Sequence, residues 1–197
     1  SHTMHLENRT SLLSLLCFST LVSLTGILRA ENWPSWRGAN SDNHAPENTD
    51  VPIRWDLESG SNIVWKTAIP GRGHSSPIVV GESIFLTTAE ADKQTQSLLK
   101  VDRESGRLMD QWILHRGTLP RRIHPNNSYA SPTPTYDGEN LFVAFHTNDA
   151  IWLTAITTSG QNVWSIRVCD FKPNAFQFGY GASPLIEDDL VIITAEY

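Results

Sequence analysis

Short runs of apolar and β-branched residues, bounded by glycine or acidic residues, follow one another along the chain from residue 75 onward. Such short runs, rich in Val, Ile, Leu, Thr and Phe, are typical of strands separated by turns. After the first thirty residues, Gly, Pro and Asp interrupt the chain too often for apolar residues to recur every three or four positions over a whole helix. The pattern therefore predicts an all-β protein with very little helix.

A small residue followed by Ser-Pro opens three of these runs, which reveals an internal repeat. The motifs are Ser75-Ser76-Pro77, Ala130-Ser131-Pro132 and Ala182-Ser183-Pro184, and their prolines are 55 and 52 residues apart. A period of about fifty residues is typical of propellers and other stacked arrays. Four strands in a repeated unit predict the blades of a β-propeller. The later strands of each unit are expected at Ile84–Thr88, Leu98–Val101 and around Trp112, at Leu141–Phe145, Ile151–Ile156 and around Trp164, and at Leu190–Thr194.

Residues 31–197 hold about three four-stranded blades, the third of them incomplete. Closed propellers contain about four to eight blades. We therefore expect the N-terminal part of a larger β-propeller, truncated at its C-terminus. An unclosed array leaves sheet edges with unpaired backbone groups, so self-association through these open edges is expected if this part of the propeller folds alone.

Residues 1–30 differ in kind from the rest of the chain. No charged residue occurs from Ser11 to Leu28, Leu is frequent there, and the small residue Ala30 precedes a polar stretch. This pattern predicts a secretory signal peptide, with an uncleaved N-terminal anchor in contact with the membrane as the alternative. This prediction does not use Ser1, His2 and Thr3, which precede Met4. The protein is expected to be exported to the periplasm or cell envelope.

Tryptophan recurs near the end of the last strand of each unit, at Trp65, Trp112 and Trp164. A large flat side chain there is expected to fill the wedge between neighbouring blades, and a sugar-stacking surface is the alternative. Trp112 follows its turn glycine by six residues and Trp164 by four, so Asp110 stands where a tryptophan would be expected. The difference predicts a bulge in the second unit.

Composition excludes some classes of function. The formal net charge is −6 and no basic run is present, which argues against general nucleic-acid binding. Cys169 is the one cysteine outside the leader and is expected to be a small buried hydrophobe rather than a reactive thiol. His115 and His124 lack partners at the short spacing of a zinc site, so no metal site is expected. No nucleophile-elbow or phosphate-loop motif occurs.

Several longer motifs resemble those of the PQQ-like β-propeller repeat proteins of bacteria. They are Trp33-Pro34-Ser35-Trp36-Arg37-Gly38, Pro70-Gly71-Arg72-Gly73-His74-Ser75-Ser76-Pro77, the stretch from Arg122 to Pro132, the stretch from Ala150 to Ala155, and the stretch from Phe178 to Pro184. The resemblance covers almost all of the chain from Trp33 onward. It implies an eight-bladed propeller that is usually exported. The family is named for its similarity to quinone-dependent alcohol dehydrogenases, includes the propeller lipoprotein of the outer-membrane β-barrel assembly machinery, and does not imply one activity.

The quinoprotein dehydrogenases of this resemblance hold their quinone with a pair of adjacent cysteines and a calcium ion bound by carboxylate and amide groups. The chain has neither adjacent cysteines nor an Asp, Glu and Asn cluster at calcium-loop spacing. Asp188-Asp189 lies in an expected hairpin turn, where acidic residues are common. We therefore expect no cofactor and no catalytic residues, with pyrroloquinoline quinone and calcium as the alternative.

The segments that lead into each Ser-Pro are the candidate binding surface. In a propeller the first strand of each blade lines the central channel, so the loops entering these strands converge on one mouth of the channel. Cationic, amide and aromatic groups at a concave mouth suit an anionic or sugar-like ligand or an extended peptide. Alternatively, these side chains only satisfy backbone groups in tight loops. The candidate ligand-binding residues are Arg72, His74, Arg122, His124, Asn127, Tyr129 and Tyr180, with Arg121, Asn126 and Phe178 beside them.

The sequence thus favours a non-catalytic, exported β-propeller module for binding or scaffolding. Its partner at the channel mouth is expected to be a protein or a small polar or anionic ligand. A fragment of a quinoprotein-type oxidoreductase and a subunit of a polysaccharide-related enzyme are the alternatives.

Overall fold

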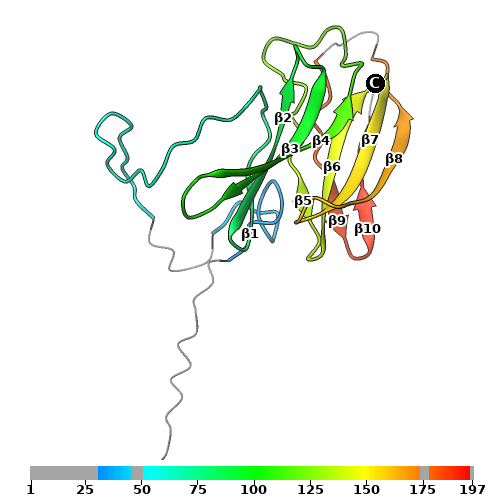
Figure 1. Ribbon diagram of the computed structural model, residues 1–197. Coiled ribbons are helices and arrows are strands. Elements are labelled where there is room, and N and C mark those ends of the chain that lie inside the picture. Colours follow the sequence, from blue (N-terminus) through cyan, green and yellow to red (C-terminus); the bar gives the residue numbers. More distant parts are fainter. Residues whose placement is uncertain (1–30, 46–50, 174–177, 196–197) are drawn as a thin grey trace, which may run out of the picture.

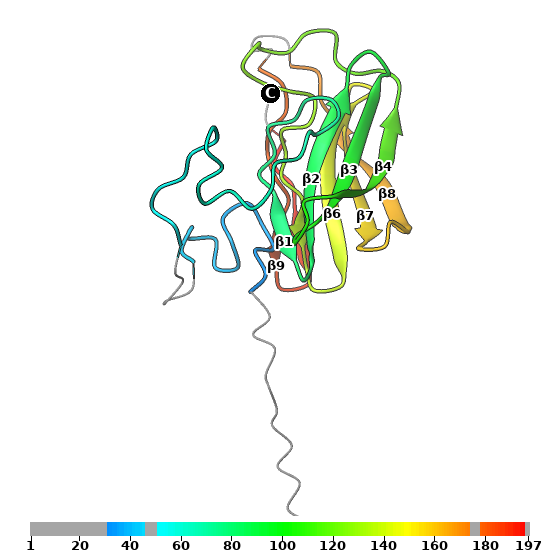
Figure 2. The same ribbon diagram turned by 60° about the vertical axis from the view of Figure 1, so that its left-hand side comes forward.

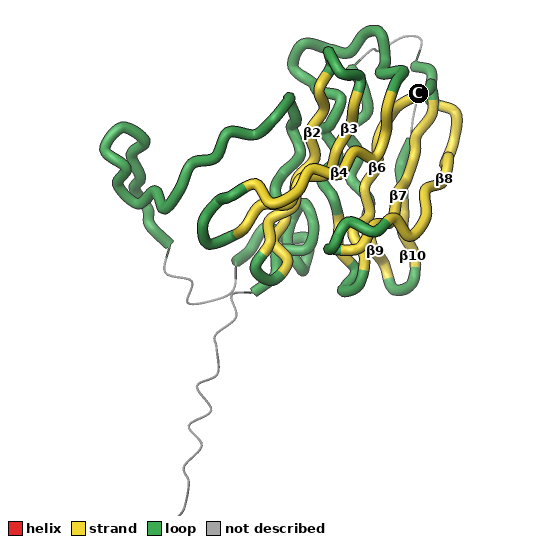
Figure 3. Tube along the Cα trace, viewed as in Figure 1, coloured by secondary structure: helices red, strands yellow, loops and turns green. Residues whose placement is uncertain are grey.

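The computed structural model describes residues 31–45, 51–173 and 178–195. All regular structure in these ranges is β-strand, with no helix, and it forms three antiparallel sheets (Figure 3). The two larger sheets have four strands each, and the third is a two-stranded hairpin. The predicted all-β fold and the four-stranded repeat unit are therefore confirmed. The predicted leader lies outside the described residues, and the number of blades in a closed propeller stays a prediction.

Blade 1 consists of β1 (Ile78–Val80), β2 (Ser83–Glu90), β3 (Thr95–Asp102) and β4 (Leu108–Arg116), hydrogen-bonded in that order. Blade 2 repeats this order with β5 (Thr135–Tyr136), β6 (Asn140–Thr147), β7 (Ala150–Thr157) and β8 (Asn162–Asp170). The hairpin, which we call blade 3, consists of β9 (Leu185–Glu187) and β10 (Leu190–Ile192). Figures 1 and 2 show the three sheets side by side, with the strand axes of one sheet roughly aligned with those of the next.

Two apolar clusters join the sheets because β6 alternates its side chains between them. Leu141, Val143 and Phe145 pack toward blade 1 in a cluster that includes Phe85 and Leu98. Phe142 and Ala144 belong instead to a second cluster that includes Ile186 and Val191 of blade 3. The inner part of blade 2 therefore packs between two neighbouring sheets, as expected for stacked blades, whereas its outer strand β8 is largely exposed.

A tryptophan of one unit packs on the turn glycine of the next. Gly160, in the β7–β8 turn, has φ +92°, and a Cβ added there would lie 2.3 Å from Cε2 of Trp112 on β4. Gly106, in the β3–β4 turn, has the same relation to Trp65, whose Nε1 donates a 3.0 Å hydrogen bond to the Arg103 carbonyl. Packing between blades is therefore confirmed for Trp112. Trp164 is 36% exposed and contacts Phe142 within its own blade, with ring centroids 5.8 Å apart.

The predicted irregularity of the second unit is present, and blade 1 has it as well. The β3–β4 pairing shifts register at Gln96/Ser97 and at Lys100/Val101, and the β7–β8 pairing shifts at Ile151/Trp152 and at Ala155/Ile156. The second shift places Asp110 opposite Lys100, at the position that Trp164 holds opposite Ala155. The unequal glycine-to-tryptophan spacing therefore comes from moving the tryptophan by two residues along the same face of the outer strand.

Hydrogen bonds between neighbouring units run along the Ser-Pro repeats. The Ser76 amide donates to Thr133 Oγ1 and the Thr133 amide donates to Ser183 Oγ, each over 2.9 Å. The Thr135 hydroxyl donates to the Pro184 carbonyl over 2.6 Å. The repeated Ser-Pro and Thr positions thus satisfy backbone groups that the short inner strands leave unpaired.

Residues 31–38 lie along the free edge of β1. Trp33 exchanges two backbone hydrogen bonds with Val79, of 2.8 and 2.9 Å, and the Pro34 carbonyl accepts one from the Tyr136 amide over 2.8 Å. The segment therefore ties the inner strands of blades 1 and 2 together. Residues 51–64 extend away from the sheets (Figure 1) and leave Ile53 and Val64 more than four-fifths exposed.

Candidate functional site

Two chain connections cross the same end of the sheets. Crossover A (117–134) joins β4 to β5, and crossover B joins β8 to β9 and is described here by its residues 171–173 and 178–184. Because the strands alternate in direction, the β2–β3 and β6–β7 turns lie at this end too, which we call the mouth face (Figures 1 and 2). The remaining turns lie at the opposite end, so the loops that enter the inner strands do gather on one face.

Crossover A carries basic residues and no acidic ones, and most of the acidic turn residues lie at the opposite end of the sheets. No Asp or Glu occurs from Gln111 to Tyr136, whereas Arg116, Arg121 and Arg122 lie in that stretch. The turns at the opposite end are predominantly acidic, since Arg103 and Arg107 are outnumbered there by Glu82, Asp102, Glu104, Asp137, Glu139, Glu187, Asp188 and Asp189. Crossover A is thus a locally cationic part of a negatively charged protein, beside the acidic residues Glu90, Asp92 and Asp149 of the turns at the same end, and it favours the approach of an anionic partner.

A tight turn between β6 and β7 connects the two crossovers. Asn148 and Asp149 have φ of +52° and +53°, as a two-residue hairpin turn requires, and Asn and Asp tolerate this conformation well. The Asn148 amide donates to the Thr118 carbonyl over 3.1 Å, and the Asp149 carbonyl accepts from the Phe171 amide over 2.9 Å. The turn therefore fixes a residue of each crossover at the top of blade 2.

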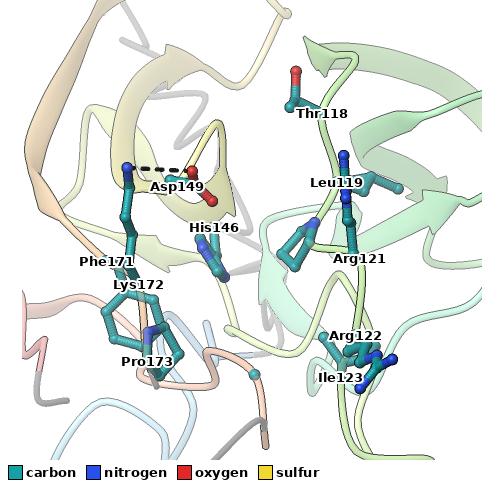
Figure 4. Close-up of a pocket in the computed structure, with 12 residues that line it drawn as sticks. Thr118, Leu119, Arg121, Arg122, Ile123, His146, Asp149, Phe171, Lys172 and Pro173 are labelled. Atoms are coloured by element: carbon teal, nitrogen blue, oxygen red, sulfur yellow. Dashed lines mark ion pairs between the residues drawn. The ribbon is translucent and has the colours of Figure 1, made fainter.

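A pocket of about 680 Å³ lies over this turn (Figure 4). Crossover A supplies one wall with Arg121 and Arg122, and crossover B supplies the other with Lys172, while His146 lies between the two walls. The Lys172 ammonium is 3.4 Å from an Asp149 carboxylate oxygen, and both side chains are more than three-fifths exposed. The rest of the lining is largely apolar or uncharged: Thr118, Leu119, Pro120, Ile123, Phe171, Pro173 and Gly179.

Three of the sequence-predicted residues present exposed cationic or imidazole side chains at the mouth face: Arg72, His74 and Arg122. Arg72 Nη2 donates to the Pro125 carbonyl over 2.8 Å, which ties the segment before β1 to crossover A. The backbone amide of His74 donates to the Ala130 carbonyl over 3.0 Å, and the His74 side chain is exposed. Arg121 and Arg122 make no ion pair with a described residue.

The other predicted residues hold the crossovers in place. The half-buried His124 ring lies 5.0 Å from the Phe178 ring, and Asn127 Nδ2 donates to the Phe178 carbonyl. Tyr129 packs beside the cluster between blades 1 and 2. Tyr180 is 7% exposed, and its hydroxyl donates to the Thr194 carbonyl over 2.9 Å.

Burial changes the pKa of two groups near the pocket. It lowers the pKa of His146 below the ordinary value, although the Phe171 backbone and the Asp149 carboxylate act in the opposite direction. The His146 ring packs edge-on against Phe171, with centroids 4.8 Å apart. Burial also raises the pKa of the Tyr180 phenol, so this hydroxyl stays a neutral donor.

Sequence reasoning missed His146, Asp149 and Lys172. His146 and Asp149 follow the second Ser-Pro motif instead of leading into it, and Lys172 stands at the start of the segment before the third motif without another basic residue in that segment. The one available signal was the pair Asn148-Asp149 between two strand runs, which marks a hairpin turn at the end where the crossovers meet. Locating the pocket required the path of both crossovers over blade 2, which the repeat pattern does not specify.

A family model described as outer membrane protein assembly factor BamB, a PQQ-repeat model, matches residues 47–196. The chain belongs to this family. The PQQ-repeat family is a β-propeller family, in agreement with the four-stranded blades and with the motifs from Trp33 onward. No curated protein matches the chain in a sequence comparison.

The described part of the chain lacks the side chains that the resemblance associates with quinone and calcium in the PQQ-dependent enzymes. Cys169 is the free cysteine there, without an adjacent cysteine, and no group of three His, Cys, Asp or Glu side chains could hold a metal ion within those residues. In the same residues no helix has the length and hydropathy to cross a membrane. Quinone binding by this chain stays an untested alternative.

Proposed function

We propose that this chain is part of an exported β-propeller that binds a protein partner at its mouth face without catalysing a reaction. Membership of a family described by an outer-membrane assembly factor supports both the envelope location and a protein-binding role. The β-propeller fold alone does not specify a partner, so the choice of partner depends on the chemistry of the mouth face.

The observation that carries the proposal is the acid-free crossover A above an otherwise acidic protein. Arg121 and Arg122 are exposed there and make no ion pair with a described residue, and Arg72 is hydrogen-bonded to the same crossover. Arginine forms planar, two-pronged hydrogen bonds with carboxylates. A partner that presents acidic side chains in an extended segment would match this surface.

Titration of the chain with a blocked acidic peptide, acetyl-Leu-Glu-Leu-Glu-Leu-amide, tests the proposal. We expect binding that weakens as salt is added, because exposed charges are screened by ions. The Arg72→Gln, Arg122→Gln double variant should bind more weakly. The control double variant Arg54→Gln, Arg107→Gln removes two exposed cations that lie outside the mouth face and should bind like the unaltered chain.

Two results would count against the proposal. Equal weakening in the control and mouth-face variants would show that only net charge matters. Retention of pyrroloquinoline quinone by the chain after dialysis with calcium, seen in the absorption spectrum, would favour the oxidoreductase alternative instead.

A further inference from the structure

The pocket over blade 2 brings three cationic side chains from two distant parts of the chain around one cavity. Arg121 and Arg122 belong to crossover A, and Lys172 belongs to crossover B, with the pocket between them (Figure 4). The volume of about 680 Å³ lies within the range of about 300–1,000 Å³ typical of ligand sites. Asp149 supplies the one carboxylate of the lining, so the cations outnumber the acids even with a neutral His146.

The charge of this pocket does not follow from blade geometry alone. A smaller cavity of about 230 Å³ lies at the corresponding place over blade 1, beside the β2–β3 turn. There the charged lining is Arg72, Glu90 and Asp92, so the carboxylates outnumber the cation. The two blades share the same arrangement of strands, yet their pockets have opposite charge. The cationic character of the blade 2 pocket therefore comes from its own lining residues and not from the repeated fold.

The lining of the blade 2 pocket identifies the class of ligand. Arginine and lysine side chains offer only hydrogen-bond donors, and a carboxylate offers only acceptors. The exposed Lys172–Asp149 pair contributes little stability, so Lys172 can turn toward an incoming carboxylate at small cost. Leu119, Ile123 and Pro173 add apolar surface for a neighbouring aliphatic side chain.

We infer that this pocket binds a carboxylate side chain of an acidic protein segment together with an adjacent apolar residue. Arg121 and Arg122 contact the carboxylate from one wall and Lys172 contacts it from the other. The inference rests on the proposed function, since it names the place on the mouth face where the acidic partner docks.

The experiment compares variants of the full chain with the blocked Leu-Glu peptide as probe. Arg121→Gln and Lys172→Gln should each weaken binding by about tenfold, as expected for the loss of a charge-assisted hydrogen bond. Asp149→Asn should strengthen binding, because it removes the carboxylate that competes for Lys172 while keeping a residue suited to the turn. If Lys172 acted only by holding the turn through Asp149, both substitutions would weaken binding, and this result would overturn the inference.

Further peptides separate the sources of the carboxylate. The matched peptide with Gln in place of Glu and a blocked C-terminus should not bind. If the Gln peptide with a free C-terminus bound as well as the Glu peptide, the pocket would be a site for a chain terminus. If inorganic phosphate competed at equal concentration, the pocket would be a general anion site, and either outcome would contradict a site for acidic side chains.

The failure of this inference can be told apart from the failure of the proposed function. If the unaltered chain did not bind the Glu peptide at all, the proposed function would fail. If binding were weakened by the Arg72→Gln, His74→Gln double variant but unchanged by Arg121→Gln and Lys172→Gln, the mouth face would bind the partner and the pocket would not.

Discussion

Replacement of Gly160 by alanine tests the packing of one blade on the next. An added Cβ would lie 2.3 Å from Cε2 of Trp112, which is too close for two non-bonded carbon atoms. The indole ring cannot move freely, because it is stacked on Phe85 with centroids 6.3 Å apart and an angle of 28° between the planes. The substitution therefore forces either the turn or the tryptophan out of place.

The expected cost has two parts. Alanine at φ +92° loses about 1–2 kcal/mol through backbone strain. Overpacking against the indole adds about 1–3 kcal/mol. Gly117 provides the matched control, because its φ is +82° and a Cβ there would meet nothing within 4 Å. Gly117→Ala should therefore lose only the strain, and Gly160→Ala should lose about 1–3 kcal/mol more.

Urea unfolding followed by tryptophan fluorescence measures both variants. The double variant Gly160→Ala, Trp112→Leu should lose less stability than the sum of the two single changes, since the smaller side chain removes the clash. Equal losses for Gly160→Ala and Gly117→Ala, or strict additivity with Trp112→Leu, would refute the inter-blade contact.

Three further predictions concern buried and half-buried polar groups. Ser183→Ala removes the acceptor of the Thr133 amide and should lower the free energy of unfolding by about 1–3 kcal/mol, whereas the exposed Ser159→Ala should have little effect in the same urea assay. Tyr180→Phe removes the hydrogen bond from the buried hydroxyl to the Thr194 carbonyl and should cost about 0.5–1.5 kcal/mol by the same measurement; an unchanged stability would contradict a contribution from this bond. Burial lowers the pKa of His115 and His146 below 6.5, so the unfolded chain binds more protons and the stability should fall as the pH drops below about 6.5. His146→Gln should flatten this slope in urea unfolding at pH 7.5, 6.5 and 5.5, and an unchanged slope would contradict the assignment.

The strands followed from the sequence because each repeated unit combines a Ser-Pro start with β-branched runs and turn residues. The run predicted at Leu141–Phe145 becomes β6 (Asn140–Thr147), and the run at Ile151–Ile156 becomes β7 (Ala150–Thr157). The observed strands are longer because antiparallel pairing continues to the turn residues, from Asn140↔Thr157 to Thr147↔Ala150. Periodicity marks the apolar centre of a strand and not the polar residues at its ends.

The tryptophan arrangement was only partly predictable. The sequence showed that the glycine-to-tryptophan spacing differs between units, but it assigned the irregularity to the second unit alone. Both blades contain the same two register shifts, because the partner strands define them and one strand alone does not reveal them. Packing of Trp112 on Gly160 likewise depends on the distance between two blades.

The position of the candidate residues on one face was predictable from the sequence, and the pocket was not. Arg72, His74 and Arg122 lie at the mouth face, as the loops before the inner strands implied. Which groups would be buried was not visible in the sequence, and Tyr180 forms part of the packing between blades 2 and 3. Lys172 lines the same pocket as Arg121 because crossover B starts beside the β6–β7 turn, where the Phe171 amide donates to the Asp149 carbonyl.

Mapping of the acidic peptide onto the labelled chain by NMR tests the central claim most directly. Backbone amide shifts are recorded while the blocked Leu-Glu peptide is added. We expect the largest changes in 117–124, at His146 to Asp149, and at Phe171 and Lys172. Changes concentrated in the acidic turns at the opposite end, or spread evenly over the chain, would contradict a cationic mouth face that binds an acidic partner.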